Sequence, residues 1–107
     1  MAVSGSSFAA EGGAAGRRCV RILVRGRVQG VGFRAWLLGR ARRCGLDGRV
    51  GNRRDGTVEV VASGEAGRVE DLIADCRHGP PAARVEAIEI DDASPPEKGG
   101  FDIAETW

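Results

Sequence analysis

The chain of 107 residues has few of the side chains on which many functional sites depend. It contains one histidine, three cysteines and no tyrosine, and aromatic residues make up 5% of it. Cys19, Cys44 and Cys76 are odd in number and form no C-x-x-C pair. The pattern excludes a disulfide framework, and the single histidine cannot complete a zinc site beside these cysteines. We therefore expect no metal.

Long apolar segments are also missing. No stretch approaches the roughly 18 consecutive apolar residues of a membrane-spanning helix, and residues 1–16 have neither the basic start nor the apolar block of a secretory signal. We therefore expect a cytoplasmic protein with no membrane partner. A chain of this length supports one modest core, so we expect a flexible tail at residues 1–17 and one domain at residues 18–107.

Lysine is nearly absent, and the basic charge that arginine supplies is unevenly distributed. Residues 17–54 hold twelve arginines against one acid, whereas residues 55–107 hold four basic residues against thirteen acids. The net charge of the whole chain is only +1. The first half therefore favours an anionic partner.

Apolar periodicity predicts elements in the order β-α-β-β-α-β. One helix begins near Phe33 and ends at Gly45, and the turn at Asp55-Gly56 predicts an antiparallel hairpin. This order predicts an α+β, ferredoxin-like sandwich, with an antiparallel four-stranded sheet and two helices on one face. The predicted strands are residues 19–24, 46–52, 57–63 and 84–90, the second helix is marked by residues 69–76, and residues 101–103 can add a short edge strand.

The segment V-R-G-R-V-Q-G-V-G-F-R at residues 24–34 carries the strongest functional signal. It places three glycines between a strand and a helix, where backbone N–H groups can turn inward around an anion and the helix dipole favours negative charge. Arg34 adds a planar fork of donors that suits a phosphoryl group. The residues alone also allow a plain strand-to-helix connection.

Two other nucleotide-binding loops do not fit this segment. A phosphate-binding loop of the G-x-x-x-x-G-K-[ST] type needs a lysine that is missing here. Residues 30–35 match the dinucleotide pattern G-x-G-x-x-G/A, but that fold needs parallel β-α-β units, and the predicted hairpin makes the next connection antiparallel.

Together with L-D-G-R-V-G-N-R-R-D-G-T-V-E-V at residues 46–60 and G-P-P-A-A-R-V at residues 79–85, the segment resembles the acylphosphatase family over about residues 20–103. The resemblance implies a ferredoxin-like fold. It also implies an enzyme that hydrolyses carboxyl-phosphate mixed anhydrides, small-molecule acyl phosphates, to a carboxylate and inorganic phosphate without metal or cofactor.

The resemblance also implies the roles of individual residues. Arg34 would bind the substrate phosphate, Asn52 would orient the attacking water, and the backbone N–H groups of five residues would complete the phosphate cradle. By its position before a turn alone, Asn52 would more often be a turn residue. Arg49 and Gly51 depart from the residue types common in the family. The five cradle residues are Gln29, Gly30, Val31, Gly32 and Phe33.

Two alternatives remain beside the enzyme, which we expect to be a monomer. One is a catalytically silent acylphosphatase-like module that binds a phosphorylated metabolite or a partner. The other is an RNA-binding domain, because such domains share this order of elements, but they stack bases on sheet aromatics that this chain lacks. We expect no nucleic acid as a partner.

Overall fold

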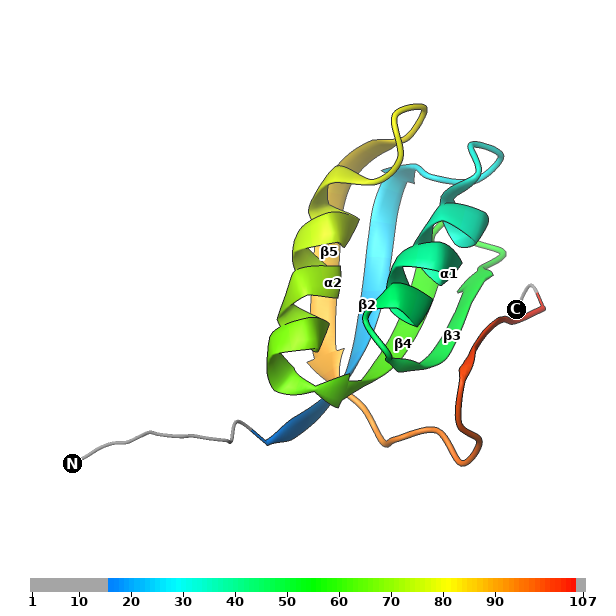
Figure 1. The fold of residues 1–107 in the computed structure, drawn as a ribbon. Helices are drawn as coiled ribbons and strands as arrows, with labels where there is room; N and C mark the ends of the chain where they lie inside the picture. Colours follow the sequence, from blue (N-terminus) through cyan, green and yellow to red (C-terminus); the bar gives the residue numbers. More distant parts are fainter. Residues whose placement is uncertain (1–15, 106–107) are drawn as a thin grey trace.

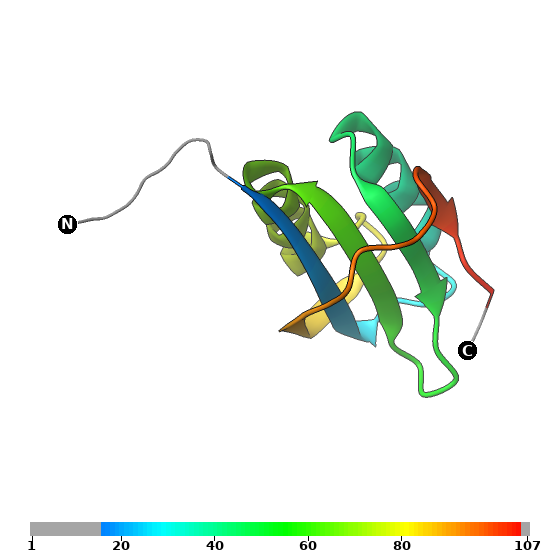
Figure 2. The same ribbon diagram turned by 90° about the horizontal axis from the view of Figure 1, so that it is seen from below.

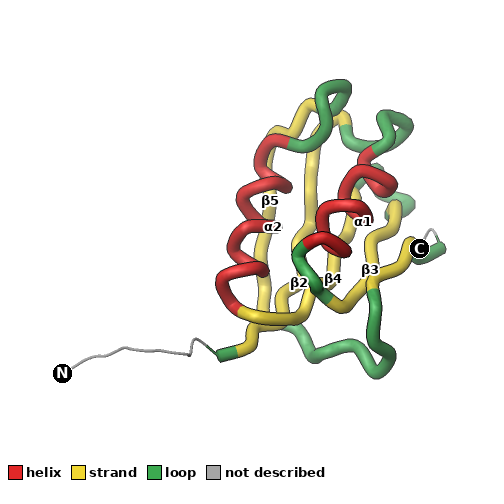
Figure 3. The backbone as a smooth tube through the Cα atoms, in the orientation of Figure 1, coloured by secondary structure: helices red, strands yellow, loops and turns green. Residues whose placement is uncertain are grey.

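The computed structural model describes residues 16–105, in which two helices pack on one face of a sheet (Figures 1 and 3). The predicted tail at residues 1–17 lies outside the described residues except for its last two. Arg17 is the first residue of the first strand. The elements are β2 Arg17–Arg27, α1 Phe33–Arg43, β3 Asp47–Asn52, β4 Val58–Glu65, α2 Ala66–His78, β5 Arg84–Asp92 and β6 Phe101–Ile103.

The sheet confirms the predicted ferredoxin-like arrangement and adds one strand to it. Its order is β5-β2-β4-β3-β6, and the four long strands pair with one another in antiparallel fashion. β6 is the fifth strand and pairs in parallel with β3, so the sheet is mixed and not purely antiparallel.

The path of residues 93–100 explains the parallel pairing of β6. β5 ends at the lower end of the sheet in Figure 1, and the chain then crosses that end, in front of the strands in the view from below (Figure 2). β6 therefore starts upward beside the far edge, antiparallel to β5 and in the same direction as β3. Gly48 N–H donates to the carbonyl of Gly100 at 2.9 Å, and Asp47 Oδ1 accepts from Gly100 N–H at 2.8 Å. Both contacts hold the end of this connection against the start of β3.

Glycines end both helices, as their sequence predicts. Gly45 follows α1 with φ 67°, and Gly79 follows α2 with φ 71°. This left-handed region favours glycine because it lacks a Cβ. Within residues 16–105, no helix is long and apolar enough to cross a membrane.

The core lies between the helices and the inner face of the sheet. Alternate residues of each strand point to opposite faces, and the apolar set of β2 and β4 faces the helices. The largest fully buried core side chains include Phe33 and Leu37 of α1, Leu72 of α2, Ile22 of β2, Val60 of β4 and Phe101 of β6.

Candidate active site

Two loops lie at the same end of the molecule (Figure 1), and a cleft of about 230 Å³ opens beside the first of them. The first is the cradle loop, residues 28–32, between β2 and α1. The second is the hairpin loop, residues 53–57, between β3 and β4. The cleft is lined by Val28, Gly30, Gly32, Phe33, Arg34, Ala35, Asn52 and Ile103.

The conformation of the cradle loop depends on its glycines. Gly30 has φ 74° and Gly32 has φ 79° with ψ 16°, and a Cβ added at either position would meet no atom within 4 Å. Glycine is therefore needed for the backbone angle and not for space. Gly32 is the N-cap of α1 and no side chain caps the helix, so the first N–H groups of α1 remain available to an anion.

Arg34 is the second residue of α1 and lines the cleft. Its side chain is half-buried. Among the described residues no carboxylate forms an ion pair with Arg34, whereas Arg25 and Arg53 each bind a glutamate at 2.6 Å. The guanidinium therefore adds an uncompensated positive charge beside the N-terminus of the helix.

Asn52 is the last residue of β3 and reaches the same cleft from another element. Its Oδ1 is buried, and none of the described residues donates a hydrogen bond to it. Buried side-chain oxygens normally have a partner, because leaving one without a partner is costly. An amide at the cleft, beside Arg34 and the cradle loop, whose oxygen has no donor among the described residues suits a group that holds a water molecule.

Of the two remaining cradle residues, Val31 packs against the core, and the side chain of Gln29 joins the two loops. Gln29 Nε2 donates to the carbonyl of Arg53 at 2.8 Å and to the carbonyl of Thr57 at 2.9 Å. From the sequence, Gln29 was expected to act only through its backbone. No local pattern could reveal this bridge, because its acceptors lie 24 and 28 residues along the chain.

The hairpin loop is also tied within itself. Asp55 Oδ1 accepts from Thr57 Oγ1 at 2.6 Å and from Thr57 N–H at 3.0 Å. These two hydrogen bonds, with smaller contributions from Arg53 and Arg25, hold the pKa of the Asp55 carboxyl below its usual range. The bonds favour a single conformation for the loop that follows Asn52.

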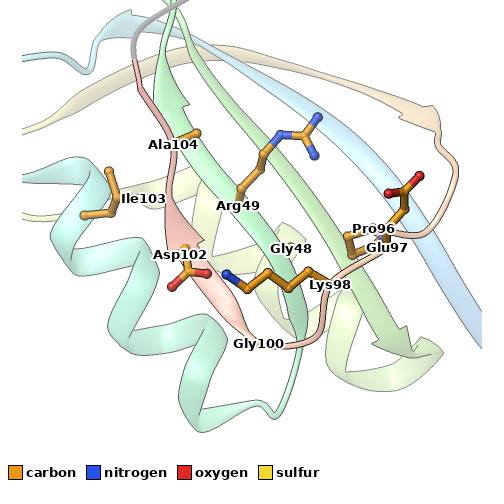
Figure 4. A pocket seen from close by; sticks show the side chains of 9 residues that line it. All are labelled: Gly48, Arg49, Pro96, Glu97, Lys98, Gly100, Asp102, Ile103 and Ala104. Carbon is orange, nitrogen blue, oxygen red and sulfur yellow. The ribbon is translucent and has the colours of Figure 1, made fainter.

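A larger groove of about 410 Å³ contains neither Arg34 nor Asn52. It lies where residues 96–100 return past β3 and β6, and Figure 4 shows the side chains of Arg49 and Ile103 pointing in opposite directions. Arg49 therefore faces the groove, whereas Ile103 also borders the cleft. Neither Ile103 nor Val28 was among the site residues that the sequence predicted.

The cysteines and the aromatic side chains of α1 have structural roles. Cys76 is buried, and burial raises the pKa of its thiol to about 12, so the thiol is not activated as a nucleophile. Trp36 packs edge-on against Phe33, with ring centroids 5.4 Å apart, and Arg40 lies over its ring. In the part of the chain that is described, no three His, Cys, Asp or Glu residues are grouped so that they could hold a metal ion.

Comparisons with known proteins identify the family of the chain. The acylphosphatase family model matches residues 20–103. An acylphosphatase of Rhizorhabdus wittichii is 54% identical over 81 residues, which cover 76% of this chain and 82% of that protein.

Two solved structures extend the agreement to the fold. An acylphosphatase from Coxiella burnetii has a TM-score of 0.78 and 32% identity, covering 82% of this chain and 93% of its own. One from Bacillus subtilis has a TM-score of 0.75 and 36% identity, covering 80% and 97%. The family model and relatives that share both sequence and fold lead to one conclusion: the chain belongs to the acylphosphatase family and hydrolyses carboxyl-phosphate mixed anhydrides to a carboxylate and inorganic phosphate.

Proposed function

We propose that Arg34 and the backbone N–H groups of residues 29–33 hold the phosphoryl group of the substrate while Asn52 positions the attacking water. The observation that carries this proposal is that Arg34, from α1, and Asn52, from β3, line one cleft together, and that Asn52 Oδ1 has no hydrogen-bond donor among the described residues. The N–H groups and the guanidinium suit the oxygens of the phosphoryl group, and the amide suits a water molecule.

The cleft needs no further catalytic group for this reaction. The water oxygen bonds to phosphorus while the bond from phosphorus to the carboxyl oxygen breaks, and the carboxylate leaves with the electron pair. Both water protons remain on the phosphate product. A carboxylate whose conjugate acid has a pKa of about 4 to 5 leaves at neutral pH without a proton donor. Positioning and charge stabilisation therefore supply most of the catalysis, and we propose that no metal or cofactor takes part.

Hydrolysis of benzoyl phosphate in the presence of EDTA tests these roles. We expect metal-independent turnover by the wild type and a decrease in kcat/KM of about a hundredfold to a thousandfold in Arg34→Ala. Arg34→Lys should be nearly as damaging, because a point charge cannot replace the planar fork. Arg43→Ala, an exposed position on the last turn of the same helix, is the control for loss of one positive charge.

Circular dichroism establishes that each variant is folded. Wild-type kcat/KM in a folded Arg34→Ala or Arg34→Lys would contradict the proposed role of Arg34. Turnover that EDTA abolishes would contradict the metal-independent reaction.

We further propose that the protein works as a monomer in the cytoplasm and binds no nucleic acid. A single copy of the chain brings Arg34, Asn52 and the cradle loop to one cleft, so the proposed site needs no residue from a second copy. Three unbridged cysteines suit a reducing compartment. The described aromatic side chains belong to α1 or, for Phe101, to the core, so none offers a stacking surface on the open face of the sheet. Analytical ultracentrifugation tests the oligomeric state and RNA binding. We expect the protein to sediment at the mass of a monomer and added RNA to leave its sedimentation unchanged.

A further inference from the structure

A carboxylate with no place in the proposed chemistry is buried on the side of the sheet away from the helices. Glu59 lies in β4 between Val58 and Val60, which both face the core. Alternation along the strand therefore directs Glu59 to the opposite face. Its side chain is only 6% exposed. A buried carboxylate is costly unless a partner compensates its charge, so the contacts of Glu59 call for an explanation.

Two arginines compensate the Glu59 charge at the same oxygen. Arg53 Nη1 donates to Glu59 Oε1 at 2.6 Å, and Arg21 Nη1 lies 3.6 Å from the same atom. The hydrogen bond to Glu59 is the main cause of a raised pKa at the Arg53 guanidinium. Arg21 is shared with Asp91, at 3.4 Å, so Arg53 is the closer partner of Glu59.

Arg53 connects Glu59 to the active site through the backbone. It follows Asn52 directly in the chain, its N–H donates to the carbonyl of Thr57 at 2.9 Å, and its carbonyl accepts from Gln29 Nε2 at 2.8 Å. The backbone of Arg53 is thus held by Gln29 of the cradle loop, and its guanidinium is held by Glu59 on the face of the sheet away from the helices. Arg53, the residue next to Asn52, is therefore held at both its backbone and its side chain.

We propose that Glu59 is a positioning residue for catalysis: through its ion pair with Arg53 it fixes the start of the hairpin loop and hence the Asn52 side chain. This inference rests on the role proposed above for Asn52. Glu59 touches no substrate and does not contribute to phosphate binding. Its effect is expected on the rate because a small displacement of a group that aligns the reactants slows the reaction strongly.

The test compares Glu59→Gln with Glu89→Gln. Glu89 is a matched control, since it pairs with Arg25 at the same distance, 2.6 Å, on the same face of the sheet. It differs in lying on β5 and in having a side chain that is 52% exposed. With benzoyl phosphate, we expect kcat of Glu59→Gln to fall by about tenfold or more. We expect KM, and the inhibition constant of inorganic phosphate, to change by less than about twofold. Glu89→Gln should match the wild type in all three constants.

Inhibition by phosphate separates positioning from general damage to the fold. The anion binds where we place Arg34 and the cradle loop, so a variant that loosens the whole domain would weaken phosphate inhibition as well as kcat. Arg53→Gln breaks the same ion pair from its more exposed side and carries the test if Glu59→Gln does not fold. The double variant should be no slower than the slower single variant, because both substitutions act on one contact.

Several results would overturn the inference. Wild-type kcat in folded Glu59→Gln or in Arg53→Gln would do so, as would an equal loss in Glu89→Gln, or an effect on KM and phosphate inhibition alone. Asn52→Ala separates this inference from the function on which it rests. An active Asn52→Ala overturns both, whereas an inactive Asn52→Ala beside a fully active Glu59→Gln overturns only the role of Glu59.

Discussion

The two sides of the cleft are built in different ways. The cradle loop takes its shape from consecutive residues, two of them glycines with positive φ, and runs directly into the first turn of α1. Asn52 stands at the end of a strand, and the loop beyond it is held by Gln29 and Glu59, which lie elsewhere in the chain. The side proposed to bind phosphate, with the cradle loop and Arg34, is the phosphate side, and the side proposed to position water, with Asn52, is the water side. The phosphate side is thus a local structure, while the water side depends on tertiary contacts.

This difference has a consequence for mutation. If the cradle loop binds phosphate as proposed, a substitution in it acts on phosphate binding directly and through the backbone angle. A substitution far from the cleft can still reach Asn52, because Glu59 is on the opposite face of the sheet. We therefore expect catalytic rate to be more sensitive to remote changes than phosphate binding is.

Asn52→Ala provides the largest expected effect. We expect kcat with benzoyl phosphate to fall by about a hundredfold to a thousandfold, as when a preorganised hydrogen-bonding group is removed from an active site. The melting temperature should change little, because Asn52 Oδ1 has no hydrogen-bond donor among the described residues. Kinetics and thermal melting of the same preparation measure both quantities.

Arg54→Ala is the control for this prediction, since Arg54 is exposed in the same hairpin loop and should keep both activity and stability. If Asn52→Ala lowers the melting temperature in step with its activity, Asn52 is a structural turn residue. The side of the cleft that carries Asn52 would then have no role in positioning water, and the comparison between the two sides would fail.

The sequence predicted the fold through periodicity and turn chemistry. Apolar alternation identified the strands, and Gly45 and the Asp55-Gly56 turn marked ends that the structure retains. The parallel pairing of β6 was not predictable, because it follows from the path of residues 93–100 around the end of the sheet and not from the three residues of the strand itself.

The cradle side of the site was equally accessible from sequence, since its glycines and Arg34 are neighbours in the chain. The side chains that brace the hairpin loop were not. In the pattern of β4, Glu59 is the polar residue of an alternating strand, and nothing in that pattern shows that arginines cover it. Its burial follows from the position of Arg21 on the neighbouring β2 and of Arg53 across the hairpin.

The charge asymmetry of the sequence also has a different meaning in three dimensions. Several arginines of the basic first half are paired with acids of the second half. Much of the positive charge is therefore neutralised within the fold and does not require an anionic partner. Such surface pairs contribute little each to stability. They are Arg18 with Glu70, Arg21 with Asp91, Arg25 with Glu89, Arg40 with Asp75, Arg42 with Asp102 and Arg53 with Asp55. The pairs of Arg21 and Arg53 with the buried Glu59 come in addition.

Gly32→Ala tests the local side of the comparison, with an expected effect smaller than that of Asn52→Ala. Alanine at φ 79° adopts a left-handed conformation that costs about 1–2 kcal/mol. We expect the free energy of unfolding in urea to fall by that amount. The inhibition constant of inorganic phosphate should rise, because the strained N-cap no longer aims its neighbouring N–H groups at the anion.

Gly39→Ala is a matched control within the same helix. Its added Cβ also meets no atom within 4 Å, but Gly39 lies inside α1 and has no positive φ. We expect it to gain up to about 1 kcal/mol, the helix preference of alanine over glycine. Equal stability of Gly32→Ala and the wild type would show that the backbone angle of the cradle loop is not what requires glycine.

The smallest expected effect concerns the dependence of the hairpin loop on pH. The hydrogen bonds from Thr57 lower the pKa of Asp55 in the folded protein, so the unfolded chain binds a proton at a higher pH than the folded one does. The stabilisation from Asp55 is therefore fully present above the ordinary aspartate pKa of about 3.9 and is lost as the pH falls through the lower folded value. Urea unfolding near neutral pH and below pH ~4 measures this loss.

Asp55→Ala should be less stable than the wild type near neutral pH, and the difference should shrink in acid as the wild type loses its advantage. Asp55→Asn is the control, because its amide oxygen can still accept from Thr57 but its charge state does not change with pH. A difference between wild type and Asp55→Ala that stays constant, or grows in acid, contradicts the lowered pKa. In that case the hydrogen bonds from Thr57 would hold the hairpin loop beyond Asn52 whether or not Asp55 is charged. The stability of that loop would then not depend on the protonation of Asp55.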